Sequence, residues 1–214
     1  MKYRTIPVTS FQQNCSLVWC EATNEAAFID PGGDIAQLLA VVEEENVKLT
    51  KIVLTHGHMD HVGGVGELIT QLSLPIEGPH KEDLFWIAAL DEQAKMMGFQ
   101  PVPGFEPTRW LDDGDTVKVG NINLHVLHCP GHTPGHVVFY ESQTSTAFVG
   151  DVLFNGAIGR TDFPRGNHQQ LLDSIRQKLW PLGDNVTFIP GHGPNSTFGA
   201  ERLSNPFVAD KNFG

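Results

Sequence analysis

Four short segments of the sequence each place histidine or aspartate directly after an apolar run. They read KIVLTHGHMDH, VLHCPGHTPGH, AFVGD and TFIPGHG. Imidazole nitrogens and carboxylate oxygens are the usual non-thiolate ligands of zinc and similar divalent ions. The segments therefore predict a metal centre, whose candidate ligands are His56, His58, Asp60, His61, His132, Asp151 and His192.

The number of candidate ligands predicts two ions rather than one. Seven ligands exceed the needs of one tetrahedral site, whereas hydrolytic sites with two metals hold their ions roughly 3.5–4 Å apart. An aspartate is short enough to bridge such a pair. Two ions would also lower the pKa of a shared water from ~15.7 towards ~7, which gives hydroxide at neutral pH. We expect two divalent ions per chain. Zinc is the expected metal, and iron and manganese are alternatives.

The candidate ligands need rigid elements to hold them, because strand ends fix loop residues while leaving them exposed. Apolar runs and turn signals predict strands, and amphipathic spacing predicts helices. The predicted strands span residues 5–8, 16–19, 26–30, 51–55, 116–119, 122–127, 136–140, 146–150 and 186–190. The predicted helices span residues 34–46, 80–98, 167–180 and 196–205. Strands with helices interspersed in both halves predict an α/β fold, with two helix-covered sheets in a single domain over residues 1–214.

The composition narrows the classes of partner. The chain has 214 residues, of which 40% are hydrophobic and 18% charged, and its formal net charge is -11. Because this charge repels phosphate backbones and no Lys/Arg run offsets it, we expect no nucleic-acid partner. The longest apolar run, 85–90, is far too short to cross a bilayer, so we expect no membrane partner. Three cysteines and an N-terminus without an apolar leader predict a cytoplasmic protein. We expect it to act on a small molecule and to be a monomer or a weak oligomer.

The four motifs together resemble those of a known superfamily. T-H-x-H-x-D-H, G-H-T-P-G-H, G-D and G-H-G follow one another in the order typical of the metallo-β-lactamase superfamily. The longer segments THGHMDHVGG, CPGHTPGHVVFY, GDVLFNGAIGRTDF and PGHGPNSTFGAERLSNPF look like those of its glyoxalase II (hydroxyacylglutathione hydrolase) branch. The resemblance runs from about residue 10 to 208, and it implies an αββα sandwich.

The resemblance divides the seven ligands between two metals. It assigns His56, His58 and His132 to the first metal. It assigns Asp60, His61 and His192 to the second metal. Asp151 would bridge the two metals. In true β-lactamases a cysteine commonly supplies a second-metal ligand at the place of Asp151. The aspartate therefore favours the hydrolase branch over antibiotic cleavage.

The resemblance also implies a reaction and further site residues. A hydroxide shared by both metals would attack the carbonyl of a thioester, most typically S-D-lactoylglutathione, and Asp60 would orient that hydroxide as the catalytic residue. Arg160 would bind substrate, because the branch carries a lysine at a similar distance from the bridging aspartate. An ion pair with Asp162 is the alternative for Arg160. Asp30 either supports a ligand histidine or is a turn residue.

Other readings of the same motifs stay open. Long forms of glyoxalase II contact glutathione through a C-terminal helical extension. Only 22 residues follow His192, so we expect a short form without that extension. GRTDF also occurs in the persulfide dioxygenase branch, so a mononuclear iron enzyme that uses His56, His132 and Asp151 is the main alternative. A nuclease and a non-catalytic metal-binding module are less consistent with the acidic composition and the full ligand set.

Overall fold

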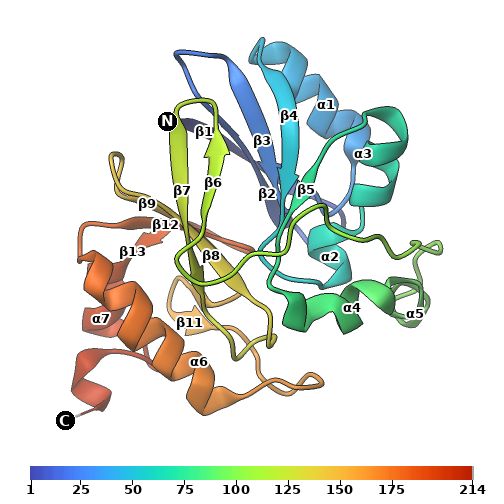
Figure 1. The fold of residues 1–214 in the computed structure, drawn as a ribbon. Coiled ribbons are helices and arrows are strands. Elements are labelled where there is room, and N and C mark those ends of the chain that lie inside the picture. Colours follow the sequence, from blue (N-terminus) through green and yellow to red (C-terminus); the bar gives the residue numbers. More distant parts are fainter. Residues whose placement is uncertain (214) are drawn as a thin grey trace.

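Two β-sheets pack face to face in the centre of the molecule, and helices cover their outer faces (Figure 1). The computed structural model describes residues 1–213. The arrangement is the αββα sandwich that the motifs implied. The chain builds its two halves in succession, since the first sheet contains β1 to β5 and the second contains β6 to β9 with β12 and β13.

The first sheet has the strand order β1-β2-β3-β4-β5. Its strands are β1 (Lys2–Val8), β2 (Gln13–Trp19), β3 (Glu25–Ile29), β4 (Lys48–Val53) and β5 (Ile76–Glu77). β1, β2 and β3 are antiparallel, whereas β3, β4 and β5 run parallel. Parallel neighbours need a crossover connection, and α1 (Ile35–Glu44) and α3 (Val65–Gln71) lie in these connections on the outer face.

The second sheet has the strand order β13-β12-β9-β8-β7-β6. Its strands are β6 (Thr116–Val119), β7 (Ile122–His128), β8 (Val137–Glu141), β9 (Thr146–Gly150), β12 (Thr187–Pro190) and β13 (Ser196–Thr197). Only the pairing of β12 with β9 is parallel. The outer face of the second sheet is covered by α6 (His168–Ser174) and α7 (Phe198–Ser204). α6 continues as a π-helical turn (Ile175–Leu179). A small hairpin, β10 (Leu153–Phe154) with β11 (Ala157–Ile158), follows β9.

The alternation of side chains along β3 explains the layered core. Ala26 and Phe28 point to the helices of the first half. Ala27 and Ile29, one residue along, point to the second sheet. Because successive side chains of a strand face opposite sides, a central strand buried on both faces must be apolar throughout. The EAAFI sequence of β3 meets that condition after its first residue.

The segment 80–98 differs from the single helix that its apolar spacing predicted. It forms a 3-10 turn (Lys81–Asp83), α4 (Leu84–Ala88) and α5 (Leu90–Met96). The break lies at Ala89, whose φ of -96° and ψ of 14° leave the α-helical region. Asp83 of the 3-10 turn contacts Gly57 and Gln93 of α5 contacts Met59, so both ends of this segment reach the residues around His58.

Several short elements were not predicted from the sequence. They are α2 (Met59–Val62), α3, β5, β10, β11, β13 and a final 3-10 turn (Asp210–Asn212). The strand predicted at 186–190 is not the last strand, because β13 pairs with the edge of β12 before α7 begins. Thr197 caps α7 by accepting a hydrogen bond from the backbone N of Ala200 at 3.2 Å. Within residues 1–213, none of the helices has the length and apolar character needed to cross a membrane.

Candidate metal centre

Four loops at strand ends bring the predicted ligands to one place. These ligands are His56 and His58 after β4, His132 after β7, Asp151 after β9 and His192 after β12. Asp60 and His61 were expected in a loop, but they lie in α2.

The start of α2 separates two neighbouring histidines. His58 precedes the helix in an extended conformation, with φ -76° and ψ 145°. His61 lies one helical turn later, and its backbone N donates to the carbonyl of His58 at 3.0 Å. The change from extended to helical backbone turns the two side chains towards different ligand clusters.

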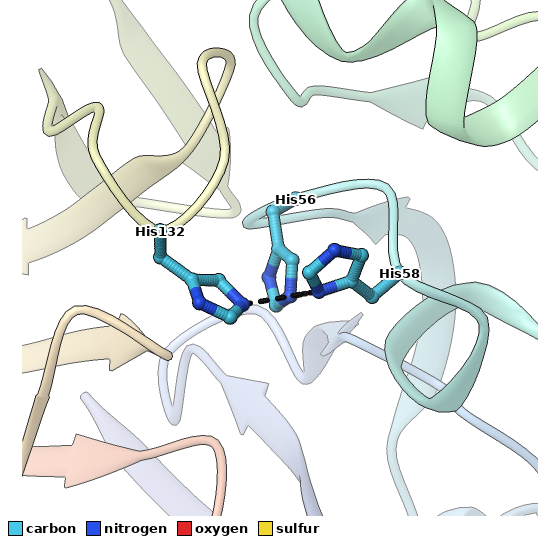
Figure 2. Close-up of side chains that lie close together, drawn as sticks. All are labelled: His56, His58 and His132. Carbon is cyan, nitrogen blue, oxygen red and sulfur yellow. Dashed lines mark hydrogen bonds between the residues drawn. The ribbon is translucent and has the colours of Figure 1, made fainter. Parts of the chain in front are cut away.

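The first cluster consists of three convergent imidazoles (Figure 2). Nδ1 of His58 lies 3.1 Å from Nε2 of His56 and 3.0 Å from Nε2 of His132. A tetrahedral zinc ion with Zn–N bonds of ~2.0–2.1 Å separates its ligand nitrogens by roughly 3.3 Å. The spacing of the three nitrogens therefore fits one such ion.

Hydrogen bonds on the far side of two rings fix which nitrogen faces the centre. Nδ1 of His56 lies 3.0 Å from the hydroxyl of Thr55, and Nδ1 of His132 lies 2.8 Å from the carbonyl oxygen of Arg160. If each Nδ1 carries the proton and donates it outward, each Nε2 presents a lone pair inward. Such outer partners are typical of metal-binding histidines.

The second cluster consists of Asp60, His61 and His192. Oδ2 of Asp60 lies 3.1 Å from Nε2 of His192 and 3.7 Å from Nε2 of His61. Nδ1 of His192 lies 3.2 Å from the carbonyl oxygen of Phe11, which fixes this ring as the outer partners fix the first cluster. The set of one carboxylate and two imidazoles suits a second divalent ion.

Asp151 faces both clusters. Its Oδ1 lies 3.3 Å from Nε2 of His61, in the second cluster. Its Oδ2 lies 3.7 Å from Nε2 of His132, in the first cluster, and 3.8 Å from Nε2 of His192. Oδ2 thus lies between the two clusters while Oδ1 faces the second, a position that suits a carboxylate bridging two ions.

Unpaired buried atoms at the centre support a fit to metal ions. Nε2 of His61 and Oδ1 of Asp151 are buried, and although they lie 3.3 Å apart, neither makes a hydrogen bond of acceptable geometry within residues 1–213. Burial lowers the pKa of His58 to about 3 and that of His56 well below its usual value. These rings are therefore neutral at pH 7 and offer lone pairs. A divalent ion in each cluster would satisfy groups that are costly to leave unpaired.

The second cluster carries more charge than the first. Burial alone would lower the pKa of His61, but the carboxylates of Asp151 and Asp60 raise it well above its usual value. Burial opposes ionisation of Asp151, yet His61 holds the pKa of this carboxyl well below its usual range. In the metal-free protein a proton on His61 therefore takes the place of a cation beside two carboxylates.

Asp30 supports ligands of both clusters. It is buried, and its Oδ2 accepts hydrogen bonds from Nδ1 of His61 at 2.9 Å and from the hydroxyl of Thr55 at 2.5 Å. Its Oδ1 accepts one from the backbone N of Thr55 at 2.7 Å. Since Thr55 in turn contacts His56, one carboxylate orients a ring in each cluster. Of the two alternatives for Asp30, the structure favours the supporting role.

Asp83 joins the two loops that supply the first cluster. Its side chain is fully buried. Oδ2 accepts hydrogen bonds from the backbone N of Gly57 at 2.9 Å and from the hydroxyl of Thr133 at 2.8 Å. Oδ1 accepts one from the backbone N of Gly135 at 2.6 Å. Gly57 lies between His56 and His58, and Thr133 follows His132, so this carboxylate fixes the distance between the two loops.

Arg160 differs in part from its predicted role. Its carbonyl oxygen holds His132, whereas its guanidinium donates to the carboxylate of Asp162 from Nε at 2.7 Å and from Nη2 at 2.6 Å. The guanidinium also lies 4.2 Å from the ring centroid of Phe163. Arg160 does line the cleft, so substrate binding by its side chain stays a prediction.

Two further residues of the CPGHTPGH segment, His136 and Cys129, are buried. His136 is fully buried, and its Nε2 accepts a hydrogen bond from the backbone N of Asp151 at 3.0 Å. It therefore positions Asp151, and its ring stacks on that of His56 with the ring centroids 4.6 Å apart. Cys129, just after β7, is buried, and burial raises its thiol pKa to about 12.

A cleft of about 790 Å³ opens above both clusters. Its floor contains ligands from each set and the bridging aspartate, and its walls are largely aromatic and aliphatic. The lining residues outside the ligand set are Phe11, Trp86, Gln93, Met96, Met97, Phe154, Ile158, Arg160, Phe163 and Pro164. Substrate-sized molecules can therefore reach the floor past walls that are mostly apolar.

Sequence reasoning missed the residues that hold the ligand loops together. Gln93 accepts a hydrogen bond from the backbone N of Met59 at 3.0 Å and donates to the carbonyl of Trp86 at 2.8 Å. Asp83, described above, lies in the same helical segment. A buried polar residue beside an otherwise apolar run would have been the signal, since Asp83 directly precedes LFWIAAL and Gln93 follows it by three residues.

Comparisons with known proteins agree with this geometry. Residues 8–192 match the family described as the Metallo-beta-lactamase superfamily. The chain is 47% identical over 212 residues to hydroxyacylglutathione hydrolase GloC of Haemophilus influenzae, which covers 99% of this chain and 100% of that protein. The solved structure of the BLEG-1 B3 metallo-beta-lactamase superposes with a TM-score of 0.88 at 34% identity, over 97% of this chain and 99% of that one. TTHA1623 in a di-iron-bound form superposes with a TM-score of 0.86 at 35% identity, over 96% and 100%.

Proposed function

The chain belongs to the metallo-β-lactamase superfamily, and from this premise we propose that it is a metal-dependent hydrolase that cleaves a thioester, with S-D-lactoylglutathione as the first expected substrate. The relative GloC, a hydroxyacylglutathione hydrolase, supports that substrate. The observation that carries the proposal is the convergence of two complete ligand clusters on Asp151, at the floor of a cleft.

The ligand sets suggest how two ions would be held. We assign the first ion to the three-imidazole cluster, the second to the cluster of Asp60, His61 and His192, and the bridge to Asp151. When bound, two such ions supply a nucleophile at neutral pH and polarise the carbonyl. Zinc is the expected ion, with iron and manganese as alternatives. The di-iron form of TTHA1623 is one reason to test iron.

The chain's own residues would position water and substrate. Asp60 lines the cleft, and His61 and His192 hold its pKa below the usual range against the effect of burial. Its carboxylate is therefore ionised at neutral pH and can accept a hydrogen bond from the attacking water, which orients the oxygen towards the carbonyl. The apolar walls exclude bulk water, so electrostatic interactions at the floor are stronger than in solvent.

The proposed reaction is a hydrolysis that needs no protein nucleophile. The oxygen of water forms a bond to the carbonyl carbon, and the carbon–sulfur bond breaks with its electron pair on sulfur. The products are a carboxylate and a thiol, and one proton is released overall. The proposal uses all seven ligands, whereas a mononuclear iron persulfide dioxygenase would use only three of them, so the number of bound ions distinguishes the two functions.

Metal analysis and a thioesterase assay test the proposal together. The protein is purified without added metal, its metal content is measured, and S-D-lactoylglutathione cleavage is followed with and without added Zn²⁺. Two ions per chain with thioester cleavage support it. One iron per chain with oxygen uptake on a persulfide would replace it by the dioxygenase, and cleavage of a β-lactam alone would replace it by a lactamase.

A variant of the bridging residue tests the assignment of ligands. Asp151→Ala removes the one carboxylate that faces both clusters, so we expect at most one ion to stay bound and thioester cleavage to fall by several orders of magnitude. Retention of two ions and wild-type turnover in this variant would contradict the bridging role.

A further inference from the structure

The walls of the cleft are apolar on the sides of both clusters. Beside the first cluster, the ring centroids of Trp86 and Phe163 lie 4.5 and 5.0 Å from that of His58. Beside the second cluster, the ring of Phe154 lies 6.3 Å from that of His192. A thioester whose carbonyl lies over the clusters must therefore place both its acyl group and its thiol group against hydrocarbon.

The cleft holds little free positive charge to recognise an anionic carrier. Among the described residues that line it, Arg160 is the one lysine or arginine. Nε and Nη2 of Arg160, one of the two edges through which a guanidinium can grip a carboxylate in bidentate fashion, are both occupied by Asp162. One face of its guanidinium lies over the ring of Phe163. The carboxylate of Asp162 thus offsets the positive charge of the Arg160 guanidinium within the cleft.

Resting on the proposed thioesterase function, we propose that this cleft selects thioesters by apolar contact on both sides of the carbonyl. In the same proposal, Asp162 is a specificity-determining residue that keeps Arg160 from selecting an anionic thiol carrier such as glutathione. Glutathione thioesters remain substrates, but their carboxylates add little to binding. The substrate class that fits best is a thioester with bulky apolar groups next to the carbonyl.

Two magnitudes set the size of the expected effects. Each buried methylene group is worth on the order of a fourfold change in binding, so an added phenyl ring should have a large effect. The Arg160–Asp162 pair is exposed, with side-chain exposures of 60% and 67%. Exposed ion pairs are worth no more than about fivefold in an equilibrium constant. The gain from releasing Arg160 should therefore be real but modest.

The test uses the zinc-loaded protein and three thioesters. S-D-lactoylglutathione and S-mandeloylglutathione share a carrier and differ by a phenyl ring in the acyl group. The D-lactoyl thioester of N-acetylcysteamine shares the lactoyl group and has an uncharged carrier. We expect kcat/KM to rise at least about tenfold from the lactoyl to the mandeloyl thioester. We also expect the two lactoyl thioesters to differ by less than about fivefold, with little dependence on salt.

Variants at the ion pair test the role of Asp162. In Asp162→Asn, the ratio of kcat/KM for the glutathione carrier to that for the uncharged carrier should rise about two- to fivefold. That ratio should become sensitive to salt, because a free guanidinium would now contact the carboxylates. The double variant Asp162→Asn/Arg160→Gln should return the ratio to the wild-type value. Both positions are exposed, so the substitutions should leave the fold intact.

The outcomes separate this inference from the proposed function. If the wild-type protein prefers the glutathione carrier by more than about tenfold in a salt-sensitive manner, the inference is overturned and the thioesterase function stands. An unchanged ratio in Asp162→Asn overturns the role of Asp162. If none of the three thioesters is cleaved by protein that holds two ions, the proposed function itself is wrong.

Discussion

Oδ2 of Asp30 lies 2.9 Å from Nδ1 of His61, and the same oxygen accepts the hydroxyl proton of Thr55. Through this contact a residue that binds no ion in our assignment determines which nitrogen of His61 faces the second cluster. The backbone at Asp30 has φ 53°, a left-handed conformation that aspartate and asparagine adopt more readily than most residues.

Asp30→Asn tests this orienting contact. The amide keeps the backbone preference, but its NH₂ group must face either the N–H of Thr55 or the two donors at Oδ2. We expect metal affinity at the second cluster to fall about 10–100-fold, as for other outer partners of ligand histidines. Zinc competition with a chromophoric chelator measures it. Asp34→Asn is a matched control, because Asp34 also has a positive φ but lies outside both clusters. Equal losses in both variants would contradict the prediction.

Substitutions at Asp83 should weaken the first cluster in a graded way. In Asp83→Asn, an amide oxygen placed at the Oδ2 position still accepts from Gly57 and Thr133, so only the bond to Gly135 is lost. Asp83→Ala breaks all three bonds and leaves three buried donors unpaired, each at about 1–3 kcal/mol. We expect a small loss of metal affinity in the first variant and at least about a tenfold loss in the second.

A neighbouring residue provides the control for Asp83. Glu82→Gln makes the same chemical change one residue earlier, on an exposed side chain that pairs with Arg165. Metal affinity and thermal stability should stay at wild-type values in this variant. The loop-joining role of Asp83 would be excluded if Asp83→Ala bound two ions as tightly as Glu82→Gln.

Metal binding should release protons from the second cluster but not from the first. Burial keeps His56, His58 and His132 neutral, since the pKa of each is lowered. His61 has a raised pKa, so it is protonated in the metal-free protein at pH 7 and must lose that proton to bind an ion. Affinity at the second cluster should therefore increase about tenfold per pH unit below that pKa, while affinity at the first should change little near neutral pH.

Titration calorimetry in buffers with different ionisation enthalpies measures this proton release. One binding step should show a heat that depends on the buffer, and the other should not. The raised pKa of His61 also affects the free energy of unfolding. Protonated His61 stabilises the metal-free fold at pH values below ~6.5, the pKa of a histidine in the unfolded chain. That contribution is lost as the pH rises through the pKa of His61. Two buffer-independent steps would contradict the charge assignment.

The positions of the ligands could be predicted because they depend on local sequence. Each ligand segment follows an apolar run, and a strand end is where a rigid element meets an exposed loop. The adjacent strands predicted at 116–119 and 122–127 were also local, and β6 and β7 pair antiparallel with Val119 opposite Ile122. The order of the four motifs then indicated the fold, which no single motif could have done.

The supporting contacts could not be predicted because they join distant segments. Asp83 contacts Gly57 and Gly135, which lie 26 and 52 residues away in sequence. No periodic pattern of apolar residues in the sequence indicates such a contact. The short helix α2 was also missed, because four residues are too few to show helical periodicity. For Arg160 the sequence left two alternatives, substrate binding and an ion pair with Asp162, because the geometry of a loop decides between them.

Gly191→Ala should disturb the centre through a single added methyl group. A Cβ at this position would lie 2.2 Å from Oδ1 of Asp151 and 2.6 Å from Cε1 of His61. Both contacts are far inside van der Waals distance, so the bridging carboxylate or the imidazole must move. Overpacking of this kind typically destabilises a protein by about 1–3 kcal/mol. We expect lower thermal stability and at least about a tenfold weaker binding of the second ion, measured by chelator competition.

Gly66→Ala is the matched control for Gly191→Ala. It adds the same methyl group within α3, where the nearest atom is Cγ of Pro103 at 3.9 Å. Alanine is favoured over glycine inside a helix by about 0.5–1 kcal/mol, so this variant should be slightly more stable and should bind two ions normally. If Gly191→Ala also kept both ions and full stability, the close packing of Gly191 against Asp151 would not be needed to hold the bridge, and flexibility of the loop after β12 would have to absorb the methyl group instead.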